Sequence, residues 1–266
     1  MRLLLTSAGI KNPSIHQALV DLLGKPVADA HALCIPTAGY GHPQSSPGGA
    51  WRFVTGRSST PMCELGWKSL GILELTALPS IEEERWVSWV QETDVLLVNG
   101  GDALYLCHWM RQSGLADLLP SLPRTLWVGL SAGSMVMTPR IGQDFVGWKP
   151  PAGGDRTLGV VDFSIFPHLD HELPPENTMA DAERCRRNPG SGIGDRRRDR
   201  HQGDRRHRRR RLRGALEAVL LLTPAGSAAS LANLTSRARM RKSCETGQPI
   251  SVVRQLESPV TPLSRR

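Results

Sequence analysis

Gly129, Ser131 and Gly133 form a G-x-S-x-G pattern directly after the apolar run 126–130. On a sharp strand-to-helix turn this spacing projects the serine hydroxyl clear of the sheet, while the glycines let the two backbones approach closely. A serine presented in this way can attack an amide carbonyl. The pattern also occurs by chance, and in the alternative interpretation the serine caps a helix and the glycines only permit tight packing.

A second glycine-rich turn, with the sequence Asn99, Gly100, Gly101 and Asp102, follows the apolar run 95–98. A glycine pair at such a turn can point backbone N–H groups into a crevice. The amide of Gly100 or Gly101, together with the amide of Ala132 after the serine, could hold the oxyanion of a tetrahedral intermediate. The alternative interpretation is a simple turn in which Asp102 caps the next helix.

A serine nucleophile needs a base, and His168 is the candidate among the eight histidines. It lies in the segment FPHLDH, at the end of the run Val160–Phe166, which predicts a strand. A surface histidine in a loop is the alternative. His168, Asp170 and His171 resemble metal ligands only weakly because a third well-spaced partner is missing, so we expect no metal.

Apolar runs alternate with helical patterns along the first part of the chain. The predicted strands are residues 2–6, 32–36, 70–75, 95–98 and 126–130, and helical spacing follows Ser14 and precedes residue 95. This alternation predicts an α/β fold, a doubly wound and mostly parallel sheet with helices on both faces. In such sheets chemistry collects at the carboxyl ends of the strands, where the candidate residues fall.

Composition indicates one globular domain with a segment appended. The chain has 266 residues, of which 39% are hydrophobic and 22% charged, and no apolar run approaches the roughly 20 residues of a membrane span. The start of the chain turns polar at Thr6, too early for a signal peptide, so we expect a cytoplasmic protein without a membrane partner. Five widely spaced cysteines predict reduced thiols.

The charge is concentrated in one tract. Residues 184–213 hold 14 arginines and 3 aspartates, while all 13 aromatic residues lie at or before Phe166. We therefore expect a folded domain over residues 1–185 and a disordered or non-native tail over residues 186–266. Nucleic-acid binding through a disordered basic tail is an alternative function that the composition makes less favourable.

Five segments together resemble the dipeptidase E (aspartyl dipeptidase) family of serine peptidases. They are LLLTSAG, CIPTAG, VNGGDALYL, GLSAGSM and FSIFPHLDHELP, in this order, within residues 1 to about 185. The resemblance implies a fold like that of class I glutamine amidotransferases, with Ser131 as nucleophile and His168 as general base. It also implies oxyanion donors at Gly100 or Gly101 and at Ala132, and an acidic position near Asp144.

By the same resemblance, the substrate would be a short peptide, such as a dipeptide with N-terminal aspartate, and no cofactor is implied. The likeness stops near Cys185, before the strand from which the family supplies the carboxylate that orients the histidine. Back-translation of residues 194–219, read from the second base of each codon, allows a sequence that resembles the family's missing strands, with Arg197 at the acid's codon. We therefore expect a frameshifted C-terminal part, missing strands and impaired activity. A noncatalytic amidotransferase-like binding module is the remaining alternative.

Overall fold

The computed structural model describes residues 1–44, 46–165 and 219–222. The strands are β1 (Arg2–Thr6), β2 (His31–Ile35), β3 (Ser69–Ile72), β4 (Val95–Val98), β5 (Leu126–Leu130) and β6 (Val219–Leu222). The α-helices are α1 (Pro13–Leu23), α2 (Ala38–Gly41), α3 (Pro47–Val54), α4 (Glu83–Gln91), α5 (Ala103–Gln112), α6 (Leu115–Leu118) and α7 (Ala132–Met135). Short 3₁₀ turns are η1 (Val27–Asp29), η2 (Leu78–Ser80), η3 (Leu119–Ser121) and η4 (Gln143–Phe145).

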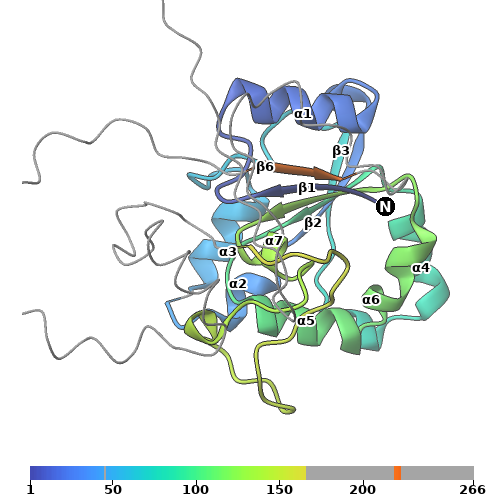
Figure 1. Ribbon diagram of the computed structural model, residues 1–266. Helices are drawn as coiled ribbons and strands as arrows, with labels where there is room; N and C mark the ends of the chain where they lie inside the picture. Colours follow the sequence, from blue (N-terminus) through green and yellow to red (C-terminus); the bar gives the residue numbers. More distant parts are fainter. Residues whose placement is uncertain (45, 166–218, 223–266) are drawn as a thin grey trace, which may run out of the picture.

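The strands form one sheet in the order β3-β2-β4-β5-β1-β6. The pairs β2–β3, β2–β4, β4–β5 and β1–β5 are parallel, and β6 runs antiparallel to β1 at the edge. Figure 1 shows α1 on one side of this sheet and α5 with α6 on the other. The predicted α/β class, with a mostly parallel sheet covered on both faces, is therefore confirmed.

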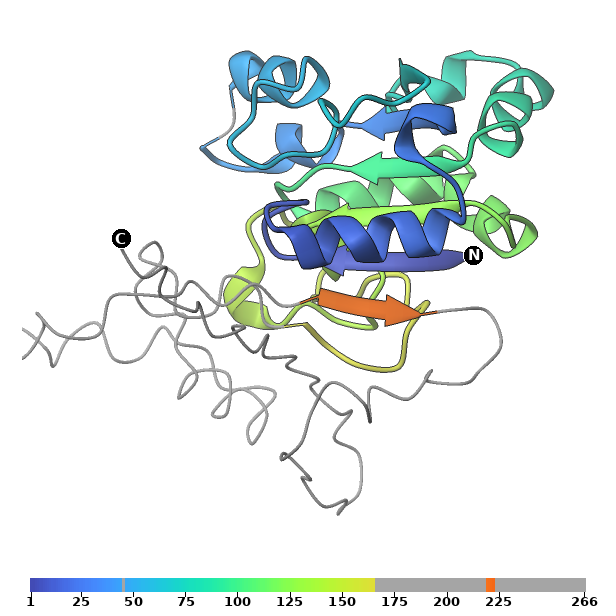
Figure 2. The same cartoon turned by 90° about the horizontal axis from the view of Figure 1, so that it is seen from above.

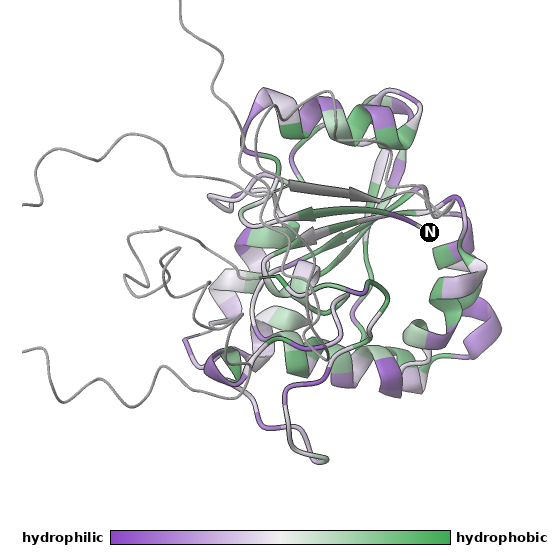
Figure 3. Ribbon diagram, viewed as in Figure 1, coloured by the Kyte–Doolittle hydropathy of each residue, from purple (hydrophilic) through white to green (hydrophobic). Residues whose placement is uncertain are grey.

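Alternation along the strands divides the core into two layers. Leu3 and Leu5 of β1 pack with α4, α5 and α7, whereas Leu4 packs with α1 and α3 on the opposite face. Figure 3 shows the apolar residues gathered on the strands, while the helices carry polar residues as well. Because both faces are buried, the strands read as continuous apolar runs, which is why the sequence revealed them.

The boundaries of α1 follow from its flanking residues. The side chain of Asn12 accepts a hydrogen bond from the Ile15 amide, and Pro13 begins the helix at a position that tolerates proline. Gly24 ends it with φ of 70°, a left-handed conformation that glycine adopts without steric cost. Buried Ile15 and Leu19 hold its apolar side against the sheet.

Two sequence expectations change at the C-terminal end of the described domain. Residues 160–165 form no strand, and the Val161 amide donates to the Met137 carbonyl oxygen just after α7 instead. Figure 2 shows β6 beside β1 at the edge of the sheet, where the sequence indicated missing strands. The remainder of residues 166–266, including the basic tract, lies outside the described residues.

The described part contains no helix long and apolar enough to cross a membrane. Cys34, Cys63 and Cys107 are free thiols, as predicted, and all three are buried. Cys185 and Cys244 lie outside the described residues.

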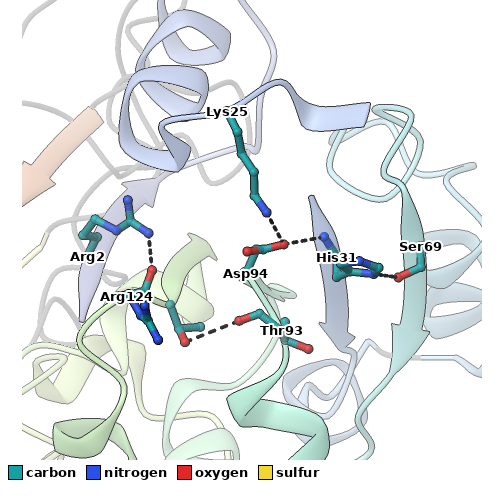
Figure 4. Close-up of polar contacts among 8 residues, drawn as sticks. Arg2, Lys25, His31, Ser69, Thr93, Asp94 and Arg124 are labelled. Atoms are coloured by element: carbon teal, nitrogen blue, oxygen red, sulfur yellow. Dashed lines mark hydrogen bonds and ion pairs between the residues drawn. The ribbon is translucent and has the colours of Figure 1, made fainter. Parts of the chain in front are cut away.

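Lys25 and Asp94 form an ion pair near the amino ends of β2 and β4, which is the opposite end of the strands from the glycine-rich turns (Figure 4). Asp94, just before β4, accepts hydrogen bonds from Lys25 Nζ and from the His31 amide, both at 2.8 Å. The His31 ring lies 2.7 Å from the Ser69 hydroxyl, so the network extends across β2 to β3. Burial acts to raise the pKa of Asp94, but the bonds from Lys25 and His31 outweigh it and hold that pKa below its ordinary value.

We expect Asp94→Asn to lower the free energy of unfolding by about 1 kcal/mol at pH 7. The value is small because the side chains of Lys25 and Asp94 are both partly exposed. A carboxyl whose pKa is depressed by folding stabilises above its unfolded pKa of about 3.9 and loses that contribution as pH falls through the folded value. The difference between wild type and variant should therefore shrink below about pH 4. Urea unfolding across pH 3 to 7 measures it, with the exposed Asp117→Asn as control. A difference that stays constant with pH would contradict this account.

Candidate active site

Ser131 occupies a strained turn between β5 and α7. Its φ is 49° and its ψ is −108°, and it is the only residue other than glycine with positive φ in the described part of the chain. A conformation of this kind costs about 1–3 kcal/mol and persists only where the surrounding structure enforces it. The side chain is half-buried and makes no capping hydrogen bond to α7. Ser131 therefore occupies the N-cap position of α7 without a side-chain bond to the helix amides.

The two glycines of the pattern are required by contact between backbones. A Cβ atom on Gly129 would lie 2.4 Å from the Gly133 carbonyl oxygen. A Cβ atom on Gly133 would lie 2.4 Å from the Val98 carbonyl oxygen at the end of β4. Any side chain at these positions would push α7 away from the strands that present Ser131.

Hydrogen bonds to β1 and β5 fasten this turn to the sheet. The Ser131 amide donates to the Thr6 carbonyl oxygen at 2.9 Å, and the Ser134 hydroxyl donates to the same oxygen at 2.8 Å. The Thr6 amide donates back to Ser134 Oγ at 2.9 Å, and Thr6 Oγ1 donates to Gly129 O at 2.8 Å. Buried Trp127 donates from its indole to Gly133 O at 2.8 Å. Sequence reasoning missed these supporting residues, because their types and spacing carry no signal until β1 and β5 are paired.

The glycine pair after β4 lies beside the serine. A Cβ atom on Gly100 would lie 3.3 Å from Ser131 Cβ, so the two turns are in contact. Gly101 has φ of 141°, and a Cβ atom there would lie 2.1 Å from the Ala38 carbonyl oxygen at the start of α2. The expectation that parallel strands bring these two turns to one edge of the sheet is therefore met.

The amides at this edge differ in their partners. The Gly100 amide donates to Oδ1 of its neighbour Asn99 at 2.9 Å. Within the described residues, the amides of Gly101 and Ala132 donate to no acceptor. These two N–H groups have capacity for an anionic oxygen, whereas the Gly100 amide is already engaged.

Asp102 caps α5, as the alternative interpretation of this turn predicts. Its Oδ1 accepts from the amides of Leu104 and Tyr105 at 2.9 and 2.8 Å. The cap does not conflict with a functional role for the preceding glycines, because it fixes the point at which the helix begins after them.

The remaining predicted residues are placed as follows. Asp144 lies in η4 and is exposed to solvent, on the loop that leads to Trp148. His168 lies outside the described residues, as do Asp170 and His171, so neither its distance from Ser131 nor the weak metal-ligand pattern is tested. Within residues 1–44, 46–165 and 219–222, no cluster of three potential metal ligands occurs.

We expect Ser131→Gly to be more stable than Ser131→Ala by about 1 kcal/mol, because both variants lack the hydroxyl and only glycine adopts this φ without strain. Chemical denaturation at neutral pH measures the difference. The matched control is the same pair of substitutions at Ser80, an exposed residue with ordinary φ, where alanine should be at least as stable as glycine. Equal stability of the two variants at position 131 would show that the turn is not strained.

Comparison with known proteins identifies one family. The model of Peptidase family S51 matches residues 3–206, more than three quarters of the chain and past Cys185. No curated protein matches. A solved structure named as a peptidase E protein, from Listeria monocytogenes EGD-e, shares 16% identity with a TM-score of 0.49, over 83% of this chain and 94% of its own. A peptidase from an acI-B1 actinobacterium shares 20% identity with a TM-score of 0.45, over 63% and 68%. On the family match, the chain belongs to Peptidase family S51.

Proposed function

We propose that the protein is a serine-type peptidase of the dipeptidase E type that hydrolyses short peptides. The observation that carries this proposal is Ser131, a half-buried serine held at φ of 49° between two obligatory glycines. A fold of this class serves many functions, so the argument rests on the site rather than on the sheet. Backbone strain at a half-buried serine is a cost without structural benefit, whereas a nucleophile needs that geometry.

In the proposed reaction Ser131 Oγ attacks the carbonyl carbon of the scissile amide while His168 takes the hydroxyl proton. The tetrahedral intermediate collapses with cleavage of the C–N bond, and the imidazolium returns the proton to the departing amine. A water molecule then attacks the acyl-enzyme by the same route and releases the carboxylic acid. The role of His168 follows from the family resemblance.

We assign the oxyanion donors to the amides of Gly101 and Ala132. Both N–H groups belong to turns that meet at Ser131, and neither has an acceptor among the described residues. Gly100 becomes the weaker candidate because its amide already donates to Asn99. Two fixed N–H donors stabilise the developing negative charge without reorganisation during the reaction.

A short peptide with N-terminal aspartate is the substrate that the family resemblance favours. Asp144 falls near an acidic position of the family, and its exposure on the loop after α7 leaves it accessible to a peptide. No cofactor takes part in the proposed steps.

A serine-directed phosphonate probe tests the nucleophile. We expect covalent labelling at Ser131, located by mass spectrometry of the digested protein, and none in Ser131→Ala. His168→Ala should slow labelling by at least about 100-fold, because a general base contributes about 10²–10⁴. Ser80→Ala, on the exposed turn η2, is the control that should label normally. A folded wild-type chain that never labels would favour the noncatalytic binding module.

We also propose that turnover is impaired, because the resemblance and the back-translation place Arg197 at the codon of the carboxylate that would orient His168. Loss of the orienting acid costs about 10⁴ in rate in other serine triads. Hydrolysis of Asp-X dipeptides should therefore be slower by about that factor than in a family member that retains the acid, assayed alongside. Comparable turnover would contradict the impairment. Sequencing the gene across the Cys185 codon decides whether a frameshift is its origin.

A further inference from the structure

We propose that Asp102 is a positioning residue for this site, and that its second carboxylate oxygen clamps the loop 142–148 to the turn that supplies Gly101. The inference rests on the proposed peptidase function. In addition to capping α5, the buried carboxylate of Asp102 would align the loop 142–148 with the turn that contains Gly101.

Asp102 lies where three segments of the site meet. Its amide donates to the Ala38 carbonyl oxygen at 2.9 Å, at the start of α2. Its Oδ1 caps α5, and its Oδ2 accepts from the Trp148 amide at 2.6 Å. The residue is only 4% exposed, so the carboxylate interacts with these backbone groups rather than with bulk water.

The loop approaches this carboxylate closely. A Cβ atom on Gly147 would lie 2.8 Å from Asp102 Oδ2 and 3.7 Å from Cδ of Pro43. Glycine at position 147 therefore lets the backbone reach the carboxylate, and any larger residue would displace one of the two. The bond from Trp148 is charge-assisted, which makes it stronger than a bond between neutral groups.

Ring contacts hold the same loop to α5 from the side. The Trp148 ring packs against Tyr105 and His108, with centroids 5.5 and 5.1 Å apart. Trp148 is thus attached at its backbone to the beginning of α5 and at its side chain to the next turns. The carboxylate decides where the loop meets the oxyanion turn, because Asp102 directly follows Gly101.

This geometry makes the two carboxylate oxygens separable by mutation. In Asp102→Asn, one oxygen can still cap α5, since asparagine is as good an N-cap as aspartate. The amide NH₂ would then face the Trp148 N–H, so that two donors oppose each other. Gly147→Ala disturbs the same contact from the loop without changing Asp102, and provides a second route if Asp102→Asn does not fold.

The first measurement is hydrogen exchange of the Trp148 amide, which does not depend on activity. We expect exchange to quicken at least about tenfold in Asp102→Asn and in Gly147→Ala, in keeping with loss of a bond to a charged group. The amides of Leu104 and Tyr105 should remain protected in both. Asp117→Asn, an exposed carboxylate on α6, is the charge-matched control that should change neither. Unchanged Trp148 exchange in both variants would overturn the clamp.

The second measurement is the labelling of Ser131 by the phosphonate probe, analysed for maximal rate and for apparent affinity. We expect the maximal rate to fall at least about tenfold in both clamp variants, with affinity little changed, because displaced oxyanion donors act on the transition state. Faster Trp148 exchange with unchanged labelling would mean that Asp102 serves stability alone, and would overturn the positioning role. A wild-type chain that never labels would refute the proposed peptidase and the positioning role, while the exchange data would still decide the clamp.

Discussion

The backbone of Ser131 is the constraint on which the site depends. A φ of 49° in a residue with a side chain is unfavourable by itself, and the bonds from Thr6 and Ser134 to the same turn maintain it. Those bonds exist only because β1 pairs with β5 in register, which places Thr6 opposite Leu130. Strand pairing in the sheet therefore offsets the strain of this serine conformation.

Buried backbone contacts leave little freedom to this arrangement. Gly133 touches the end of β4 and Gly101 touches the start of α2, so neighbouring elements fix the positions of both turns. A carboxylate joins separate segments at each end of the strands. Asp102 does so at the carboxyl ends and Asp94 at the amino ends. The turns that carry Gly101 and Ser131 both lie at the carboxyl ends of the strands, where parallel sheets present reactive groups.

Sequence patterns predicted the strands most accurately where both faces are buried. The bounds of β1, β4 and β5 agree with the apolar runs residue for residue, while β2 and β3 begin one residue earlier than predicted. β3 is also shorter, because Leu73 and Leu75 turn into the core after the strand ends. The predicted strand Val160–Phe166, which includes Asp162, is not a strand over its described residues 160–165, and the Val161 amide bonds to Met137 O just after α7 instead. The periodicity of apolar residues indicates which side chains are buried, but it does not indicate which backbone groups form hydrogen bonds with each other.

The sequence by itself determined five of the strands, the α/β class and the two glycine-rich turns that follow β4 and β5. These follow from local patterns, because glycine spacing and apolar runs are properties of short segments. Only the tertiary structure decided that the Gly100 amide is engaged by Asn99, that Thr6 and Ser134 fasten the elbow, and that Asp102 reaches Trp148. Each of these contacts is a hydrogen bond, which requires two atoms to lie about 3 Å apart in a suitable direction. That geometry depends on how the strands align in space, and no residue pattern along the chain indicates it.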